Sequence, residues 1–165
     1  MEEKRIGFIR NFIFGVEDSL VSTVGLLSGI AIAGTETKTI ILAGVVLIFV
    51  EAFSMGAGSL LSENSAAEVA MGREVPLARS YLSSLIMFVS YFFAGFIPLL
   101  PYLFLSVGTA FYVSIGVSLA ALFILGAVSA KIARTTLWKQ ALQMLIIGGI
   151  AIALGVLVGT FVGNI

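Results

Sequence analysis

The sequence contains no cysteine and no histidine, and only 11% of its 165 residues are charged. Without cysteine there can be no disulfide, thiolate metal site or thiol nucleophile. The absence of histidine removes the commonest metal ligand and the usual general base near neutral pH. Soluble domains carry about 25% charged residues, so this chain cannot cover its surface with charge as they do. Any ion site must therefore use carboxylate, hydroxyl, amide or carbonyl oxygens, or methionine sulfur.

Hydrophobic residues make up 59% of the chain and are arranged in long runs. A membrane-spanning helix needs about 20 mainly apolar residues. Five segments meet this requirement, and a charged N-terminal stretch without an A-x-A-like cleavage site leads into the first, which is therefore expected to be retained. We predict an all-α integral membrane protein, a single five-helix transmembrane domain over 1–165 with a short cytoplasmic loop at 63–79. The predicted spans are 9–33, 39–62, 80–100, 104–129 and 139–163.

The third and fourth spans lie in one charge-free stretch from Ser80 to Ala130, which is too long for a single crossing. Pro98 and Pro101 are the predicted break, because proline removes a backbone donor and clashes with the preceding helical turn. This break would give a tight hairpin between the two spans. One kinked helix followed by a re-entrant segment is the alternative.

The basic residues are distributed unevenly between the two predicted sides of the membrane. Eight of the nine lie at the N-terminus or in the second and fourth connections, and only Lys38 lies on the other side. Because cytoplasmic segments are enriched in lysine and arginine, we predict a cytoplasmic N-terminus and a C-terminus on the opposite side. Basic and acidic residues are equal at nine each, which gives no sign of a nucleic-acid partner. The lipid bilayer is the expected surrounding.

Two acidic residues fall deep within predicted spans. At 1.5 Å per residue, Asp18 lies about 13 Å and Glu51 about 16 Å from the same membrane side, so they can share one layer. An ionised carboxylate at a helix centre costs about 2.5–3.5 kcal/mol, and no lysine or arginine lies at that depth. A bound cation, a proton or cavity water would offset this cost, and all three indicate an ion pathway. The structural alternative is a protonated carboxyl hydrogen-bonded to a neighbouring helix.

Met55 lies one turn from Glu51 on the same helix face, and Ser59 and Ser62 continue that face. On the first span, Asp18 and Ser22 begin a matching stripe that continues with Gly25 and Gly29. We predict that Asp18, Glu51 and Met55 are metal ligands and that the serines line the path. Carboxylate and hydroxyl oxygens with a thioether suit Fe²⁺ or Mn²⁺ best and leave Zn²⁺ open. The alternative for Met55 is simple packing.

Three further acidic residues are candidates for a metal or proton path. Glu17 lies about 100° around the helix from Asp18, so the two acids need not face the same cavity. Glu63 and Glu68, in the second connection, can attract cations to the mouth of the path or can simply be solvated charges. Small residues also recur every four positions, which lets helices pack closely within one subunit or between two. They include Gly25, Gly29, Ala151, Gly155, Gly159 and Gly163.

The motifs FGVEDSLVSTVGLLSG, EAFSMGAGSLLSENS and AGFIPLLPY resemble the vacuolar iron transporter family, and LWKQALQMLIIGGIAIALG fits its last span. The resemblance covers essentially the whole chain. It implies a homodimeric carrier that moves Fe²⁺, and often Mn²⁺, out of the cytoplasm in exchange for protons. Its path would lie between the subunits, lined by the first two spans. By motif, Asp18 matches the family's aspartate and Met55 its methionine. The metal is transported, and no resident cofactor is expected.

The sequence departs from the family pattern in two places. Ser59 stands where the motif S-M-x-x-G-E has its glutamate, and we hypothesise that Glu51 supplies the missing charge from the same face. The connection at 63–79 has no room for the glutamate-rich metal-binding domain of longer members. The resemblance implies a plasma-membrane location in a prokaryote and a vacuolar one in a eukaryote.

Two other classes of function are compatible with a membrane protein of this kind. A non-transporting scaffold or assembly protein could use buried carboxyls for helix association. An intramembrane enzyme would need an activated nucleophile or metal-bound water, and adjacent Glu17 and Asp18 point apart on a helix. We therefore predict a transporter and no enzymatic activity.

Overall fold

The computed structural model describes residues 2–163, which form five long α-helices and one short 3-10 turn. Each of the five helices is long and apolar enough to cross a membrane, and the described residues contain no strand. The predicted all-α, five-span fold is therefore confirmed, and the chain is a multi-pass membrane protein. The elements are α1 (Glu2–Ile32), α2 (Thr37–Met71), η1 (Leu77–Arg79), α3 (Tyr81–Phe104), α4 (Val107–Ala133) and α5 (Leu137–Gly163).

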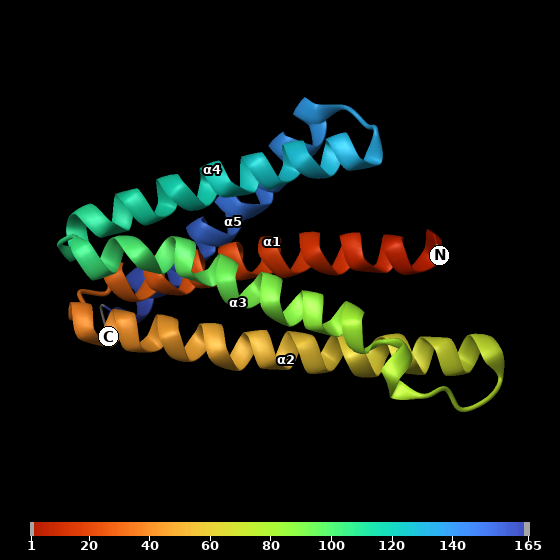
Figure 1. Ribbon diagram of the computed structural model, residues 1–165. Helices are drawn as coiled ribbons and strands as arrows, with labels where there is room; N and C mark the ends of the chain where they lie inside the picture. Colours follow the sequence, from red (N-terminus) through yellow and green to blue (C-terminus); the bar gives the residue numbers. More distant parts are fainter. Residues whose placement is uncertain (1, 164–165) are drawn as a thin grey trace.

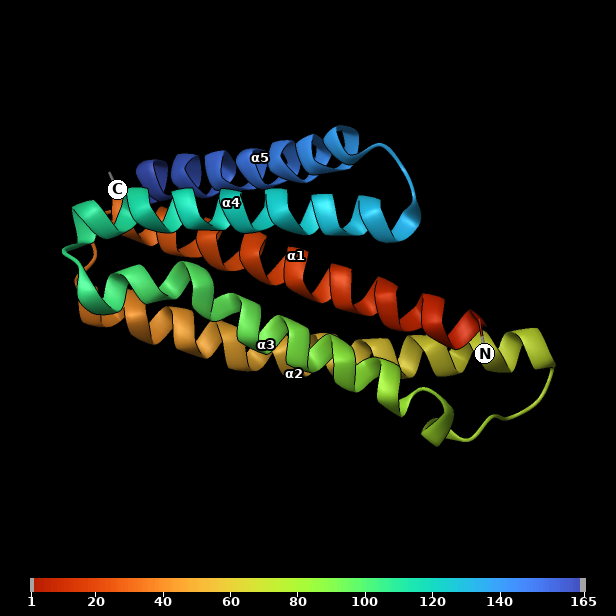
Figure 2. The same cartoon turned by 45° about the horizontal axis from the view of Figure 1, so that its top comes forward.

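Helix α1 is the centre of the bundle and touches all four other helices. Figures 1 and 2 show α2 and α3 on one side of it and α4 and α5 on the other. The start of α1 lies at the same end of the bundle as the α2–α3 and α4–α5 connections. We call this the basic end, because these segments carry eight of the nine basic residues. The end of α5 lies at the opposite end.

Helix α3 packs closely against both α1 and α2, through glycines at the points of contact. A Cβ atom added to Gly15 of α1 would lie 3.0 Å from the Met87 carbonyl oxygen, and one added to Gly56 of α2 would lie 3.0 Å from the Phe88 Cβ. Helices α1 and α2 touch each other less extensively than either touches α3. As a result, α3 forms the floor of a groove between α1 and α2.

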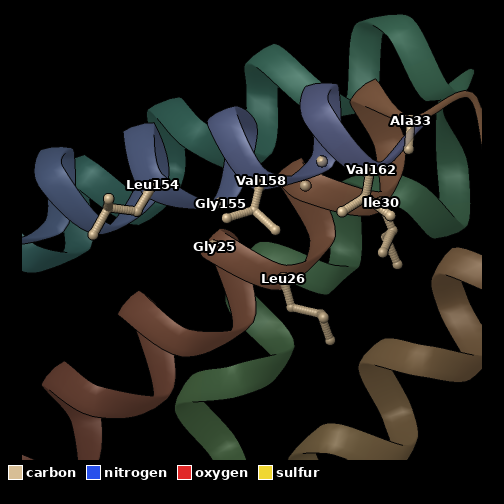
Figure 3. Close-up of a pocket in the computed structure, with 10 residues that line it drawn as sticks. Gly25, Leu26, Ile30, Ala33, Leu154, Gly155, Val158 and Val162 are labelled. Atoms are coloured by element: carbon tan, nitrogen blue, oxygen red, sulfur yellow. The ribbon is translucent and has the colours of Figure 1, made fainter. Parts of the chain in front are cut away.

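Helices α1 and α5 meet backbone to backbone along a seam of glycines (Figure 3). A Cβ atom added to Gly29 would lie 2.7 Å from the Gly155 carbonyl oxygen, and one added to Gly159 would overlap the Gly29 carbonyl. Glycine is required at these positions, because no side chain fits between the two backbones. The recurring small residues therefore pack two helices of one chain together, which was one of the two interpretations of their spacing. We call Gly25, Gly29, Gly155 and Gly159 the glycine seam.

The break between the third and fourth spans is not at the prolines, so that prediction is wrong. Pro98 and Pro101 both lie inside α3, which continues to Phe104. Each proline removes one helical hydrogen bond, the one to the carbonyl four residues earlier, and a membrane helix inside a bundle tolerates such losses. The Ser114 hydroxyl of α4 donates to the Pro98 carbonyl at 2.7 Å and so fastens α4 to α3 at this level. The chain turns only at Leu105 and Ser106, both of which are extended.

Helix α2 is longer than expected and ends at Met71 instead of residue 62. The residues after Ser62 include good helix formers and neither glycine nor proline. The helix stops at Gly72, which adopts a left-handed conformation (φ 62°) and donates to the Glu68 carbonyl. Its 35 residues span about 52 Å at 1.5 Å each, against a hydrocarbon layer of about 30 Å. Glu63 and Glu68 therefore lie on helical turns at the basic end, not in a loop.

Candidate metal-ion pathway

The structure brings together the two acids that the sequence analysis selected. Asp18 of α1 and Glu51 of α2 are partly buried and lie close enough for their charges to interact. The Tyr91 hydroxyl, from α3, interacts electrostatically with both carboxylates and forms a 2.7 Å hydrogen bond with the Ser22 hydroxyl. We call Asp18, Ser22, Glu51 and Tyr91 the acid cluster. It joins three helices inside the bundle.

No basic side chain neutralises the acid cluster among the residues that the structure describes. The one ion pair found there joins Arg10 and Glu63 at 2.9 Å, close to the basic end. Arg10 lies two helical turns from Asp18 along α1. The charge of the two carboxylates must therefore be balanced by something other than these side chains.

A groove of about 670 Å³ lies between α1 and α2, on the basic-end side of the acid cluster. Met55, Ser59 and Ser62 all line it, so the predicted stripe along α2 faces one cavity. Met87 of α3 adds a second thioether. Asp18 and Glu51 are not among the lining residues, so Met55 lies in the groove and the two carboxylates lie beyond it. The other lining residues are Arg10, Asn11, Phe14, Ser54 and Gly58.

A buried asparagine ties the three helices together at the groove. The Asn11 side chain is 2% exposed. The two N–H groups of its amide are shared among Ser59 Oγ and Glu63 Oε1, each at 2.8 Å, and Ser83 Oγ at 2.7 Å. Ser83 and Arg10 also donate to the same Glu63 oxygen, each at 2.9 Å. Glu63 is therefore held in a network at the mouth of the groove.

Glu17 and Glu68 lie apart from the groove. Glu17 lines a separate pocket of about 470 Å³ with Gln143 and Met144 of α5, away from the groove. Glu68 Oε1 accepts hydrogen bonds from the Asn64 amide at 3.0 Å and the Val75 N–H at 3.3 Å. These bonds fasten the end of α2 to the connection that follows it.

Sequence reasoning missed four residues of the site: Asn11, Ser83, Met87 and Tyr91. Asn11 had a usable signal, because it lies seven residues before Asp18 and so shares its helix face. The other three lie on the buried face of α3, which small and polar residues mark at helical spacing, so this face could have been recognised from the sequence. Their role depends on how α3 sits beneath α1 and α2.

The described residues contain no group of three or more Asp, Glu, His or Cys side chains that could hold a metal ion. The acid cluster instead offers two carboxylates with neutral hydroxyl oxygens. Such a donor set suits hard or borderline divalent cations. With so few anionic ligands it fits a cation that binds and leaves again better than a permanently held one.

Five apolar helices around an acid cluster without a basic partner among the described residues define a multi-pass membrane protein with carboxyl groups in its interior. The family model of the VIT family matches residues 9–75 and 67–160. These ranges cover most of the chain, which therefore belongs to the VIT family.

Curated relatives agree with this assignment. The chain is 25% identical over 205 aligned positions to "Vacuolar iron transporter 1" of Oryza sativa subsp. japonica, covering 88% of this chain and 81% of the relative. The protein of the same name from Eucalyptus grandis is also 25% identical, with 88% and 82% covered. "Vacuolar iron transporter cccA" of Arthroderma benhamiae is 33% identical over 82 positions, covering 44% of this chain and 29% of the relative.

Proposed function

We propose that this protein transports divalent transition metal, Fe²⁺ or Mn²⁺, out of the cytoplasm in exchange for protons. The observation that carries the proposal is the pairing of Asp18 and Glu51 inside the bundle without a basic partner. Two carboxylates balance one divalent cation, and protons are the natural alternative occupants. Membership of the VIT family and relatives named as iron transporters support a metal cargo.

The groove suggests the route that the ion takes. By the positive-inside rule the basic end faces the cytoplasm. A cation would enter the groove there, pass the thioether of Met55 and reach Asp18 and Glu51. Toward the opposite end, the Asp18 stripe of α1 continues as Gly25 and Gly29, which α5 covers along the glycine seam. This arrangement corresponds to a carrier in which the ion site is open toward the basic end and closed toward the opposite end. Exchange requires a second conformation in which the opposite end is open.

We further propose that two copies form the path together. The groove is open on one flank, where Phe14, Ser54 and Gly58 are exposed. A second copy placed there would close the groove and exclude lipid from the ion. The host membrane would be vacuolar in a eukaryote and the plasma membrane in a prokaryote.

Glu51 is proposed to replace the glutamate that the family motif has at Ser59. The Ser59 hydroxyl accepts a hydrogen bond from Asn11, so this position is committed to holding α1 and α2 together. Glu51 lies two turns away on α2, and its carboxyl group interacts electrostatically with that of Asp18. Glu51→Gln should therefore lower metal transport, and unchanged transport would contradict the replacement.

The proposed function is tested by metal flux in liposomes containing the purified full-length protein. Fe²⁺ (under anaerobic conditions), Mn²⁺, Zn²⁺ and Ca²⁺ are compared with and without an imposed pH gradient. We expect Fe²⁺ and Mn²⁺ to move, proton movement in the opposite direction, and loss of both in Asp18→Asn. Metal flux that ignores the pH gradient would contradict exchange. Absence of both flux and metal-dependent stabilisation would favour the scaffold alternative.

A further inference from the structure

We propose that the Tyr91 hydroxyl is a third oxygen ligand of the transported cation and favours hard cations over soft ones. The inference rests on the proposed function, because it concerns the same acid cluster. Tyr91 lies on α3, outside the two helices to which the sequence analysis assigned the path. Its side chain is completely buried, and its hydroxyl interacts with the charges of both Asp18 and Glu51.

Tyr91 is held in a fixed position relative to Asp18. The Ser19 hydroxyl, next to Asp18 in the chain, donates to the Tyr91 carbonyl at 2.6 Å. One turn further along α3, Gly95 lets α1 approach, because an added Cβ there would lie 2.9 Å from the Ser19 hydroxyl oxygen. The backbone of α3 is therefore fixed against α1 at the level of the acids, and the ring has little freedom to move.

The Tyr91 hydroxyl shares one hydrogen bond with the Ser22 hydroxyl, 2.7 Å away, and either of the two can be its donor. When Tyr91 donates, Ser22 can direct its own proton to the Ser19 carbonyl, 3.4 Å away, which only accepts. In that arrangement the phenol proton is engaged with Ser22, and the lone pairs of the Tyr91 oxygen remain for a cation.

The oxygens of two carboxyl groups and of the phenol then lie in one cluster without a basic side chain among the described residues. A cation is the partner that satisfies all of them together. A neutral phenol oxygen is a hard donor, so it adds a ligand for Mn²⁺ or Fe²⁺ and contributes little to softer metals. The thioethers of Met55 and Met87 lie in the groove and not in this cluster. Selectivity would therefore be set where the oxygens converge.

Tyr102 provides a matched control on the same helix. Its side chain is 1% exposed, and its hydroxyl has no hydrogen-bond partner among the described residues. It packs in an apolar cluster with Leu27, Ile48 and Leu99, away from the acids. Tyr91→Phe and Tyr102→Phe therefore remove the same atom from two buried tyrosines, only one of which faces the acid cluster.

The test measures Mn²⁺ binding to the purified full-length protein in lipid nanodiscs, from the electron paramagnetic resonance signal of free Mn²⁺. Zn²⁺ affinity is obtained by competition, and thermal unfolding without metal checks the fold. We expect Tyr91→Phe to weaken Mn²⁺ binding about tenfold, which corresponds to about 1.4 kcal/mol, with a smaller loss for Zn²⁺. Tyr102→Phe should match the wild type. Ser22→Ala, which frees the phenol, should weaken Mn²⁺ binding about threefold, as expected for one neutral hydrogen bond.

The outcomes separate this inference from the proposed function. If the wild type binds Mn²⁺ and Asp18→Asn does not, while folded Tyr91→Phe binds like the wild type, the Tyr91 inference is wrong and the metal site stands. Equal losses in Tyr91→Phe and Tyr102→Phe would also overturn it. If Tyr91→Phe does not fold, wild-type binding by Ser22→Ala overturns it instead. If the wild type binds no Mn²⁺, the proposed function itself fails.

Discussion

The two halves of one stripe on helix α1 have opposite environments. Asp18 and Ser22 in the first half lie in the acid cluster, beside the end of an open groove. Gly25 and Gly29 in the second half are covered by α5 at backbone contact. All four residues share one helix face, so the difference comes from α5. Near Asp18, helix α5 lies on the Glu17 side of α1. Two turns further along α1, it covers the face that carries Gly25 and Gly29.

The comparison shows how a carrier can combine a site and its closure without a separate gate. Polar residues keep space for an ion where the neighbouring helix lies to the side. Glycines remove that space where the same helix crosses the stripe. The apolar pocket of about 490 Å³ beside the seam, lined by Leu26, Ile30 and Leu154 among others, contains no charged residue (Figure 3). Polar lining therefore leads from the acid cluster toward the basic end, and only apolar and glycine residues line the pocket toward the opposite end.

The largest expected effect is on transport, when the charge of the polar half is removed. Asp18→Asn keeps the shape of the side chain, and we expect metal flux in liposomes to fall at least about 100-fold, the upper range for altering a metal site. Glu17→Gln is the matched control, because Glu17 lines a different pocket. It should lose less than about tenfold by the same scale. Equal losses of metal flux in both variants would show that Glu17 is as important for transport as Asp18, and would contradict this separation.

Substitutions in the glycine seam should lower the free energy of unfolding. A Cβ atom added to Gly155 would overlap the Gly25 carbonyl, whereas one added to Gly149 on the same helix meets nothing within 4 Å. We expect Gly155→Ala to lower the free energy of unfolding by about 1–3 kcal/mol, as overpacking does. Gly149→Ala should be neutral or raise it by up to about 1 kcal/mol. Unfolding in detergent micelles measures both, and indistinguishable variants would contradict the close seam.

These two halves also show how far the sequence could be interpreted. Apolar run lengths and the basic-residue asymmetry were enough to predict five spans, and helical spacing was enough to place Asp18 and Glu51 at one depth. The spacing of Gly25 and Gly29 showed that they share a face with Asp18. It could not show that α5 would cover them, because a crossing angle depends on both helices together.

The errors have local physical causes. Pro98 and Pro101 resemble a break, but α3 continues through both to Phe104, because a membrane helix packed among neighbours tolerates interior prolines, and a single sequence does not show that packing. Residues 63–71 resemble a loop because they carry charge, yet α2 simply extends past the apolar layer. The place of Tyr91 in the acid cluster depended on the packing of α3. The helical spacing of its small and polar residues marks a buried face, but not which residues of α1 and α2 that face meets.

A stability effect of similar size is expected at the mouth of the groove. Asn11→Ala removes the donors to Ser59, Glu63 and Ser83 and should lower the free energy of unfolding by about 1–3 kcal/mol, because buried acceptors lose a partner. Ser62→Ala is the control, since the Ser62 hydroxyl bonds only within its own helix, to the Ser59 carbonyl. It should change stability by less than about 0.5 kcal/mol. A similar loss in both would mean that the Asn11 network contributes little.

The smallest effect is expected from Arg10→Ala, in the same network. The Arg10 side chain is 65% exposed and that of Glu63 20%, so their ion pair should contribute at most about 1 kcal/mol. Salt screens exposed charges strongly, since the Debye length falls from about 10 Å at 0.1 M to about 3 Å at 1 M. The destabilisation in Arg10→Ala should therefore shrink toward zero in unfolding measurements at 1 M salt, whereas that in Asn11→Ala should persist. A salt-independent loss as large as that of Asn11→Ala would instead make Arg10 part of the buried network that holds the groove in place.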